Sequence, residues 1–392
     1  MKLHIAIPVM QELELLPATL ECIVNQIDAQ PFHVYICVNQ PENFWELPEK
    51  QHICTENQAV LHILSQENRF PLTIFDYSSQ GKGWKGKKSG VGYARKVLFD
   101  HITDHSEDKD IVISLDADTT FGKKYFSEIR KLFRIYPKSA GLMTPYYHRL
   151  TCNEVLDRAM LRYEIYMRCY MINLCNIGSP YNFTALGSAM VFPIHALKAV
   201  GGITPYSSGE DFYLAQKLRK YGNLLLWLPE TVFPSARLSD RVTFGTGPAL
   251  IKGVKNNWNA YPIYPPETFE PLKKTLSLFP KLFKNDYPTP VDEFLNSVFP
   301  NQNVWQPLRN NFKTEQQFIK ACHQKIDGLR TLQCLRFFEK NNNENENLIK
   351  NLHYHCNIEI IDFQFETSPV ELINDIRNRL FEKEQEMRKK SG

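Results

Sequence analysis

The chain has 392 residues, of which 43% are hydrophobic and 23% are charged, and its formal net charge at pH 7 is +3. This length is sufficient for two or three domains with buried cores. The composition is that of an ordinary globular protein. The nearly even charge excludes the strongly basic character of many nucleic-acid-binding proteins, so we expect no nucleic acid partner.

Several features of the sequence bear on the compartment of the protein. No stretch of about 18 consecutive apolar residues occurs, so we expect no membrane-spanning helix. Residues 1–8 have the pattern of a core strand and lack the long apolar segment of a signal peptide. The nine cysteines include no Cys-x-x-Cys pair, which argues against a disulfide framework or a structural zinc site. These features predict a cytoplasmic protein and leave room for peripheral association with the inner face of the membrane.

The first half of the chain alternates strand and helix patterns. Short apolar runs predict strands at residues 4–9, 34–39, 72–75, 111–115, 189–192 and 224–228. Helical spacing of apolar residues predicts helices at 13–27, near 60–64, from 93, at 123–136, at 153–176 and from 210. The alternation predicts an α/β fold, with a mostly parallel sheet flanked by helices. Ligands of such sheets bind beyond the carboxyl ends of the strands, where Asn39 and Asp116 would lie.

From about residue 252 the composition changes. Residues 261–271 and 280–290 are rich in proline and read as a loop-rich connector. Helices are predicted at 312–340 and 370–390. We therefore expect two regions, 1–245 and 246–392, of which the second is a connector followed by a largely helical C-terminal part. The aromatic residues Tyr261, Tyr264 and Phe269 have two interpretations, contact with a sugar or a membrane-bound acceptor and packing in the core or linker, of which we expect the packing.

Asp116 and Asp118 directly follow the apolar run at 111–115. Two carboxylates at the end of a buried strand are costly to desolvate unless a cation lies between them. Mg²⁺ and Mn²⁺ bind carboxylate and phosphate oxygens together. The pair therefore has two interpretations, a divalent metal site for a phosphate-bearing ligand or a solvated turn with two exposed acids.

A second acidic pair, Glu210 and Asp211, follows Gly209 at the predicted start of a helix. Acidic residues at this position can simply cap free N–H groups and complement the helix dipole. The pair comes after the strand at 189–192 and the turn at Gly201 and Gly202. This order gains meaning when it is combined with Asp116 and Asp118.

Several short motifs follow one another along residues 1–240. They are Pro8 after the first strand, Asn39 at the end of the second, Gly90-x-Gly92-x-Ala94-Arg95, Asp116-Ala117-Asp118, Gly187-Ser-Ala and Gly209-Glu210-Asp211. Their order resembles that of family 2 glycosyltransferases, which have the GT-A fold. The resemblance implies an α/β GT-A nucleotide-diphospho-sugar transferase domain at residues 1–245. It also implies metal-dependent, inverting transfer of a sugar to an acceptor hydroxyl.

The resemblance further implies a role for each residue. Asp118, and Asp116 directly or through water, would hold Mn²⁺ or Mg²⁺ against the diphosphate of the donor. Asp211 would be the general base that deprotonates the acceptor, and Glu210 would position the acceptor or the base. The residues implied to bind the nucleotide sugar are Pro8, Glu12, Asn39, Arg95, Asp116 and Ala117.

The chain departs from the family pattern in places. Asn39 stands where the family often has Asp, which leaves the donor open between UDP- and GDP-sugars. No histidine is an evident third metal ligand, and Arg237 and Arg241 are expected to close over the diphosphate instead. The Gln-x-x-Arg-Trp signature of processive synthases is absent, which predicts non-processive transfer. The acceptor class stays open among a glycan, a lipid-linked molecule and a small molecule.

The loop at 81–88 supports alternatives. It nearly spells a P-loop, although Lys88 replaces the Ser or Thr that would hold Mg²⁺. It also contains Gly-x-Gly-x-x-Gly, which a dinucleotide site would need directly after the first strand. Its lysines surround Trp84, a mixture that occurs in single-strand nucleic-acid binders. A P-loop-like NTPase using Gly81 to Lys88 is therefore the main alternative to a transferase.

Overall fold

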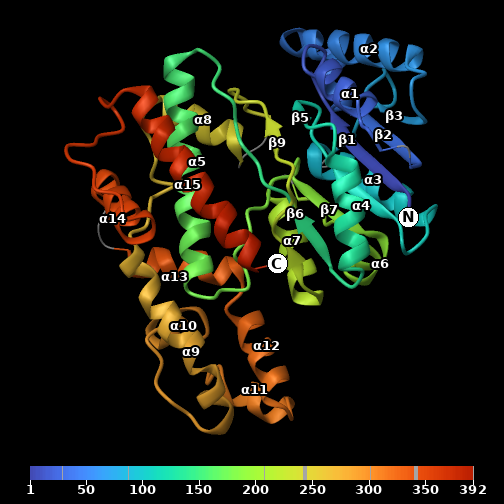
Figure 1. Cartoon of the computed structure of the whole chain (residues 1–392). Helices are drawn as coiled ribbons and strands as arrows, with labels where there is room; N and C mark the ends of the chain where they lie inside the picture. The colour runs from blue at the N-terminus through green and yellow to red at the C-terminus, as the bar shows by residue number, and fades with distance from the viewer. Residues whose placement is uncertain are drawn as a thin grey trace. The chain divides into compact units, whose positions relative to one another are not determined.

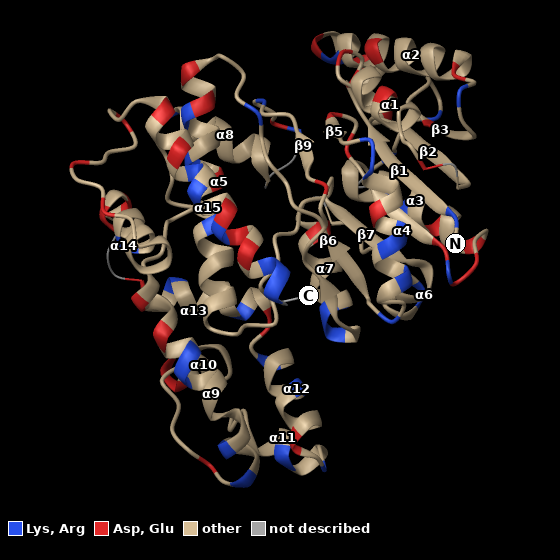
Figure 2. Cartoon of the chain, viewed as in Figure 1, with Lys and Arg blue, Asp and Glu red and all other residues tan. Residues whose placement is uncertain are grey.

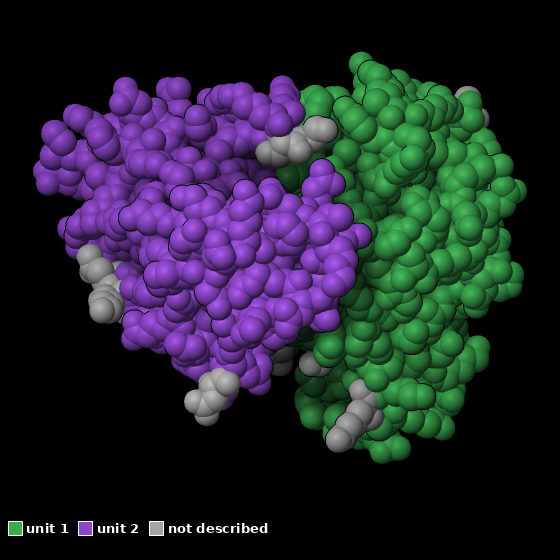
Figure 3. All heavy atoms as spheres, turned by 90° about the horizontal axis from the view of Figure 1, so that it is seen from below, with its two compact units in different colours: residues 1–160, 184–255, 392 green, residues 161–183, 256–391 purple. Residues whose placement is uncertain are grey.

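The computed structural model describes residues 1–28, 30–86, 88–206, 208–241, 245–300, 302–339 and 343–391. The chain forms two compact units (Figure 3), one built from residues 1–160 and 184–255 and the other from 161–183 and 256–391. Helix α5 (Glu154–Asn176) contributes to both units. Compact units need not coincide with domains, so the predicted division at residue 245 stays a prediction.

A seven-stranded sheet forms the centre of the first unit (Figure 1), in the order β3-β2-β1-β4-β7-β6-β8. Its strands are β1 (Leu3–Val9), β2 (Phe32–Asn39), β3 (Leu72–Tyr77), β4 (Ile111–Ser114), β6 (Gly141–Met143), β7 (Met190–Pro193) and β8 (Leu224–Leu225). All neighbours are parallel except the two pairs that β7 makes, with β4 and with β6. The predicted mostly parallel sheet is therefore confirmed.

Helices cover this sheet because its central strands are apolar on both faces. Every residue of β1 and β4 is buried, as parallel sheets require. Helix α3 packs on β1 and β2, α2 on β2, and α6 on β7. The helices of this unit besides α5 are α1 (Leu16–Val24), α2 (Gln51–Gln66), α3 (Val91–Asp104), α4 (Tyr125–Ile135), α6 (Ile194–Ala199), α7 (Glu210–Tyr221) and α8 (Thr246–Val254), with 3₁₀ turns at Glu42–Glu46 and Pro48–Lys50.

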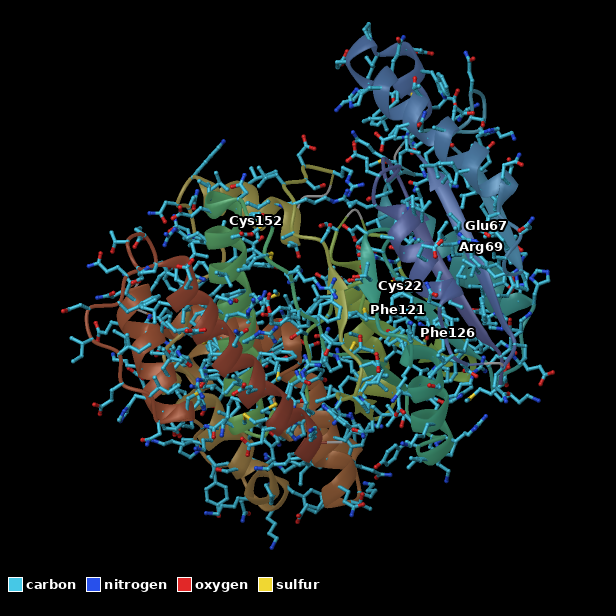
Figure 4. All side chains as sticks on the ribbon, turned by 45° about the horizontal axis from the view of Figure 1, so that its top comes forward. Cys22, Glu67, Arg69, Phe121, Phe126 and Cys152 are labelled. Atoms are coloured by element: carbon cyan, nitrogen blue, oxygen red, sulfur yellow. The ribbon has the colours of Figure 1, made fainter. Side chains whose placement is uncertain are left out.

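A separate two-stranded antiparallel sheet joins β5 (Thr119–Phe121) to β9 (Val232–Pro234). Phe121 of β5 stacks on Phe126 of α4 with ring centroids 5.9 Å apart (Figure 4). Because β5 begins directly after Asp118 and β9 ends directly before Ser235, their pairing brings together two residues that are 117 positions apart.

Strand β1 lies between β2 and β4, so the chain leaves it on one side and returns on the other. Such a reversal of strand order opens a crevice at the carboxyl ends of the strands, where ligands of α/β sheets bind. The loops that follow β1, β2 and β4 start at this edge. They contain Glu12, Gln40 and Asp116, respectively.

The second unit is helical, which confirms the predicted helical C-terminal region. Residues 161–176 of α5 take part in two apolar clusters. Ile165 and Ile172 belong to the cluster that contains Leu352, whereas Leu174 belongs to the cluster that contains Phe279. Among the described residues, no helix is both long enough and apolar enough to cross a membrane. The other helices of this unit are α9 (Glu270–Lys284), α10 (Asp292–Val298), α11 (Gln306–Asn311), α12 (Glu315–Lys325), α13 (Gly328–Phe338), α14 (Glu344–Cys356) and α15 (Val370–Ser391), with a 3₁₀ turn at Pro266–Phe269.

Two predicted elements of this region are wrong in detail. The single helix predicted for 312–340 is divided into α12 and α13, because the side chain of Asp327 caps α13 by accepting a hydrogen bond from the Arg330 N–H at 3.1 Å. Residues 280–290 are not irregular throughout, since α9 continues through Pro280 to Lys284. The predicted packing of Tyr261, Tyr264 and Phe269 is confirmed, because all three side chains are buried.

Charged side chains join α5 to α15 in the interior of the second unit. Figure 2 shows that both helices carry blue bands of Lys or Arg and red bands of Asp or Glu. Arg168 pairs with Glu164 and with Glu384. Glu384 also pairs with Arg388 at 2.7 Å, and Glu164 pairs with Arg377 at 3.1 Å. No side chain of the five is more than 1% exposed. Removing one partner therefore leaves an uncompensated charge out of reach of water.

We expect Glu384→Gln to lower the free energy of unfolding by about 3–5 kcal/mol, because Arg168 and Arg388 would lose their shared counter-charge. Chemical denaturation followed by circular dichroism measures the change. Glu382→Gln, on the exposed side of the same helix, is the matched control and should change stability by less than about 0.5 kcal/mol. Equal stability of the two variants would contradict a stabilising role for the buried pairs.

Candidate active site

The two acidic pairs of the sequence lie in the first unit. Asp116 and Asp118 form the turn between β4 and β5, and Glu210 and Asp211 form the first turn of α7. Gly209 precedes α7 with φ at 76°, a left-handed conformation that costs glycine little. This turn starts the helix with two acidic side chains, where the partial positive charge of the helix N-terminus favours them.

Arg95 of α3 links the two acidic pairs. It is only 4% exposed. One Nη group donates to Oε1 of Glu210 and the other donates to Oδ1 of Asp116. Burial acts to lower the pKa of Arg95, but the surrounding carboxylates raise that pKa above its usual range, so the guanidinium stays charged. The sequence predicted that Arg95 contacts the donor, and this contact stays a prediction, since the guanidinium binds two protein carboxylates here.

The backbone of Gly187 lies against this guanidinium. A Cβ at position 187 would overlap with the guanidinium of Arg95, and even Nη1 would be only 2.7 Å away. Ser114 holds the backbone in place, because its Oγ donates to the Gly187 carbonyl at 2.6 Å. Glycine is therefore required at this position by close approach and not by its backbone conformation.

Asp116 and Asp118 each keep one carboxylate oxygen largely free. The Asp116 side chain is 37% exposed, and its Oδ2 has no hydrogen-bond partner among the described residues. Partial burial of the carboxylate raises the pKa of Asp116. The charge of Arg95 opposes this shift, and the charge of Asp118 adds to it. In Asp118, Oδ2 accepts from the Ser235 hydroxyl at 2.7 Å, whereas Oδ1 has only Thr119 Oγ1 at 3.5 Å.

Carboxylate oxygens such as these two can bind a divalent ion whose coordination is completed by a ligand. Within the described part of the chain, no group of three His, Cys, Asp or Glu residues is placed to hold a metal ion. Mg²⁺ is commonly bound by one or two carboxylates together with substrate phosphates. Asp116 and Asp118 are therefore suited to a metal that arrives with a phosphate-bearing donor.

Glu12, in the loop after β1, binds the two arginines that were expected to close over the diphosphate. It is 6% exposed. Its Oε1 accepts from Nη2 of Arg237 and, at 2.7 Å, from Nη1 of Arg241. Arg241 also donates to the carbonyl of Met10. In this structure both arginines are thus held by the protein itself at the edge of the site.

The carboxyl group of Asp211 has the electrostatic surroundings of a base. Burial raises the pKa of Asp211 to about 7, and the negative charges of Glu210 and Asp116 add to this effect. Arg95 and the N–H of Phe212, which donates to Oδ1 at 2.7 Å, act in the opposite direction. A pKa near the working pH is the most useful value for a general base.

Asn39 uses both ends of its amide within the protein. Its Nδ2 donates to the Val9 carbonyl at 2.9 Å, and its Oδ1 accepts from the Trp84 indole N–H at 3.1 Å. Trp84 in turn stacks on Tyr77 with ring centroids 4.1 Å apart. An Asp could accept from Trp84 but could not donate to Val9, so local structure requires the amide. Contact of Asn39 with a nucleobase stays a prediction.

Sequence reasoning missed Tyr77 and the partnership of Trp84 with Asn39. Pro8 and Ala117 are the remaining residues predicted to bind the nucleotide sugar, and both are buried. Pro8 lies in β1, and Ala117 lies between Asp116 and Asp118 in the sequence. The carbonyl of Ala117 accepts from the Thr19 hydroxyl at 2.8 Å, which ties the turn to α1.

Two glycine amides of the loop at 81–88 are bound within the protein and are not free for a phosphate. The N–H groups of Gly81 and Gly83 donate to the two carboxylate oxygens of Glu42 at 2.7 and 2.6 Å. Lys82 pairs with Asp76 at 2.9 Å. Lys87, the residue that would act as a P-loop lysine, lies outside the described residues. The NTPase alternative gains no support from this loop.

The fold and the family comparison define the class of protein. Residues 111–245 match the family model described as glycosyl transferase family group 2, and this range contains both acidic pairs. The chain is thus a glycosyltransferase. The matched range is less than half of the chain. The match agrees with the resemblance to family 2 read from the sequence, as does the mostly parallel sheet flanked by helices.

No curated protein matches the chain. One similar solved structure is S. aureus TarS 1–349 in complex with UDP-GlcNAc, at 12% identity and a TM-score of 0.42, covering 99% of this chain and 91% of that chain. Another is the mannosyltransferase PcManGT from Pyrobaculum calidifontis in complex with GDP-Man and Mn²⁺, at 14% identity and a TM-score of 0.40, covering 83% of this chain and 87% of that chain. Similarity at this level carries no conclusion about donor or acceptor.

We expect Gly187→Ala to lower the rate of sugar transfer or donor hydrolysis by about 100-fold or more, because the new Cβ would push Arg95 away from Asp116 and Glu210. Displacements of about 1 Å in an active site can have effects on the order of 10²-fold. Gly222→Ala is the control, since its Cβ would meet only Ala140, at 3.1 Å. A Gly187→Ala variant with the wild-type rate would show that the position of Arg95 is not needed.

Proposed function

We propose that the chain catalyses metal-dependent, inverting transfer of one sugar per encounter from a nucleoside diphosphate sugar to an acceptor hydroxyl. The observation that carries this proposal is the position of Arg95, whose guanidinium binds Asp116 on one side and Glu210 on the other. It brings a candidate metal ligand next to the candidate base, Asp211. The family match supports the class of reaction.

Asp116 and Asp118 would hold Mn²⁺ or Mg²⁺. The metal, when bound, supplies positive charge that stabilises the leaving nucleoside diphosphate. The composition of the site supports this assignment, because its carboxyl groups outnumber its guanidinium groups by two. The carboxyl groups are those of Glu12, Asp116, Asp118, Glu210 and Asp211, and the guanidinium groups are those of Arg95, Arg237 and Arg241.

Asp211 would take the proton of the acceptor hydroxyl as that oxygen attacks the anomeric carbon. A base that acts on the face opposite the leaving group predicts inversion at this carbon. Glu210 would be a positioning residue, because it binds Arg95 and its charge raises the pKa of Asp211. Efficient proton transfer needs this pKa close to the working pH.

The donor would be a UDP- or GDP-sugar whose nucleotide lies toward Pro8, Glu12 and Asn39. Asn39 would act mainly by holding Trp84 in place. The acceptor would be a glycan, a lipid-linked molecule or a small molecule, and the cytoplasmic location stays a prediction.

A panel of nucleotide sugars tests the proposal. We expect one UDP- or GDP-sugar to raise the melting temperature of the chain and to be slowly hydrolysed, both only with Mn²⁺ or Mg²⁺ present. Asp118→Asn should remove the metal-dependent part of both signals, since a metal ligand is lost. A response to ATP alone, lost in Lys87→Ala and kept in Asp118→Asn, would favour the NTPase instead.

We expect Asp211→Asn to lower transfer by about 10³-fold or more while the affinity for donor and metal changes less than about threefold, because only proton transfer is removed. In the wild type, kcat/KM should rise with pH through about 7, since the base acts when deprotonated and its protonated fraction grows below that pH. Asp104→Asn, on the exposed end of α3, is the control. Transfer retained in Asp211→Asn would exclude Asp211 as the base.

A further inference from the structure

Of the two arginines on Glu12, Arg237 directly contacts a predicted metal ligand, whereas Arg241 acts on Asp116 through its charge. Nη2 of Arg237 lies 3.0 Å from Oδ2 of Asp118 while it donates to Oε1 of Glu12. The other contacts of Arg241 are to the Met10 carbonyl and, through Nε at 3.0 Å, to Ser239 Oγ. Arg237 therefore bridges two carboxylates, whereas Arg241 is bound to one.

Arg237 is a charged group placed on Asp118. Burial acts to lower the pKa of Arg237, but Glu12 and Asp118 raise it overall, so the side chain stays protonated. Its contact with Asp118 is on Oδ2, the oxygen that also accepts from Ser235. The arginine thus offsets part of the negative charge of Asp118.

A divalent ion and this guanidinium repel each other when both are on Asp118. A divalent ion held by Asp118 would share that carboxylate with Arg237, and the repulsion between like charges grows as their distance falls. Metal binding therefore favours movement of Arg237 away from Asp118.

Glu12 offers Arg237 a second place. Its Oε2 is buried and has no hydrogen-bond partner in the described residues, although a buried carboxylate oxygen normally accepts a hydrogen bond. Movement of the guanidinium from Asp118 toward Oε2 would pair this oxygen and free Asp118 in one step.

We propose that Arg237 is a resident counter-ion of Asp118 that competes with the divalent metal in the donor-free chain. Glu12 is the positioning residue that retains Arg237 when the metal takes Asp118. This inference rests on the proposed function, because it takes Asp118 as a metal ligand. It means that Arg237 keeps metal affinity low until a donor diphosphate supplies negative charge for both cations.

The test is titration of Mn²⁺ into the full donor-free chain, with free Mn²⁺ measured by electron paramagnetic resonance. Arg237→Gln should bind Mn²⁺ about fivefold or more tightly than the wild type. Arg241→Gln removes the same charge from Glu12 but acts on the proposed metal ligands only through its charge on Asp116, so it should raise the affinity less than Arg237→Gln does. Thermal melting of each variant checks that the fold is retained.

Glu12→Gln gives a second and opposite readout. With its anchor weakened, Arg237 should stay on Asp118, so Mn²⁺ should bind about threefold or more weakly. This effect should disappear in the double variant with Arg237→Gln, because that variant lacks the competing arginine. A purely structural role of Glu12 would persist in the double variant.

Two failures can be told apart. Mn²⁺ binding that is lost in Asp118→Asn but is equal or weaker in Arg237→Gln overturns the competition and leaves the proposed function in place. Absence of Mn²⁺ binding to the wild type, with and without UDP or GDP, overturns the metal dependence of the proposed function and the competition together.

Discussion

Arg95 is buried between two carboxylates that belong to segments far apart in the chain, Asp116 after β4 and Glu210 at the start of α7. A charge at this depth is stable only while its partners stay in contact with it. The two ion pairs of Arg95 therefore hold the end of β4, α3 and the start of α7 together. It also places Asp211 beside negative charge, which adds to burial in producing a base that titrates near neutrality.

The other charged contacts of the site depend on which arginine binds which carboxylates. Arg95 is buried and forms ion pairs with Asp116 and Glu210. Arg237 is partly exposed and forms ion pairs with Glu12 and Asp118. The first arrangement is suited to a permanent structural role. The second is suited to exchange, because a partly hydrated guanidinium loses less when one contact is broken. Arg95 thus stabilises the site, whereas Arg237 is placed to move when a ligand binds.

Much of the fold was predictable because apolar runs and their ends are local properties of a sequence. The strand before Asp116 and the glycine turn before Glu210 are examples. Contacts across the fold had no such local signal. The hydrogen bond between Ser235 and Asp118 depends on the β5–β9 pairing. The guanidinium of Arg95 can reach its two carboxylates only because Gly187 lacks a side chain. The helix break at Asp327 was missed because a single capping residue decided it.

The hydrogen bonds of Asn39 have a consequence for how this part of the chain evolves. The amide must donate to the Val9 carbonyl and accept from the Trp84 indole at the same time. Replacing it with Asp would set a carboxylate against a carbonyl oxygen, unless position 84 or the first strand changed as well. The residues at positions 39 and 84 should therefore co-vary among homologues. Homologues with the same pair should have the same loop geometry.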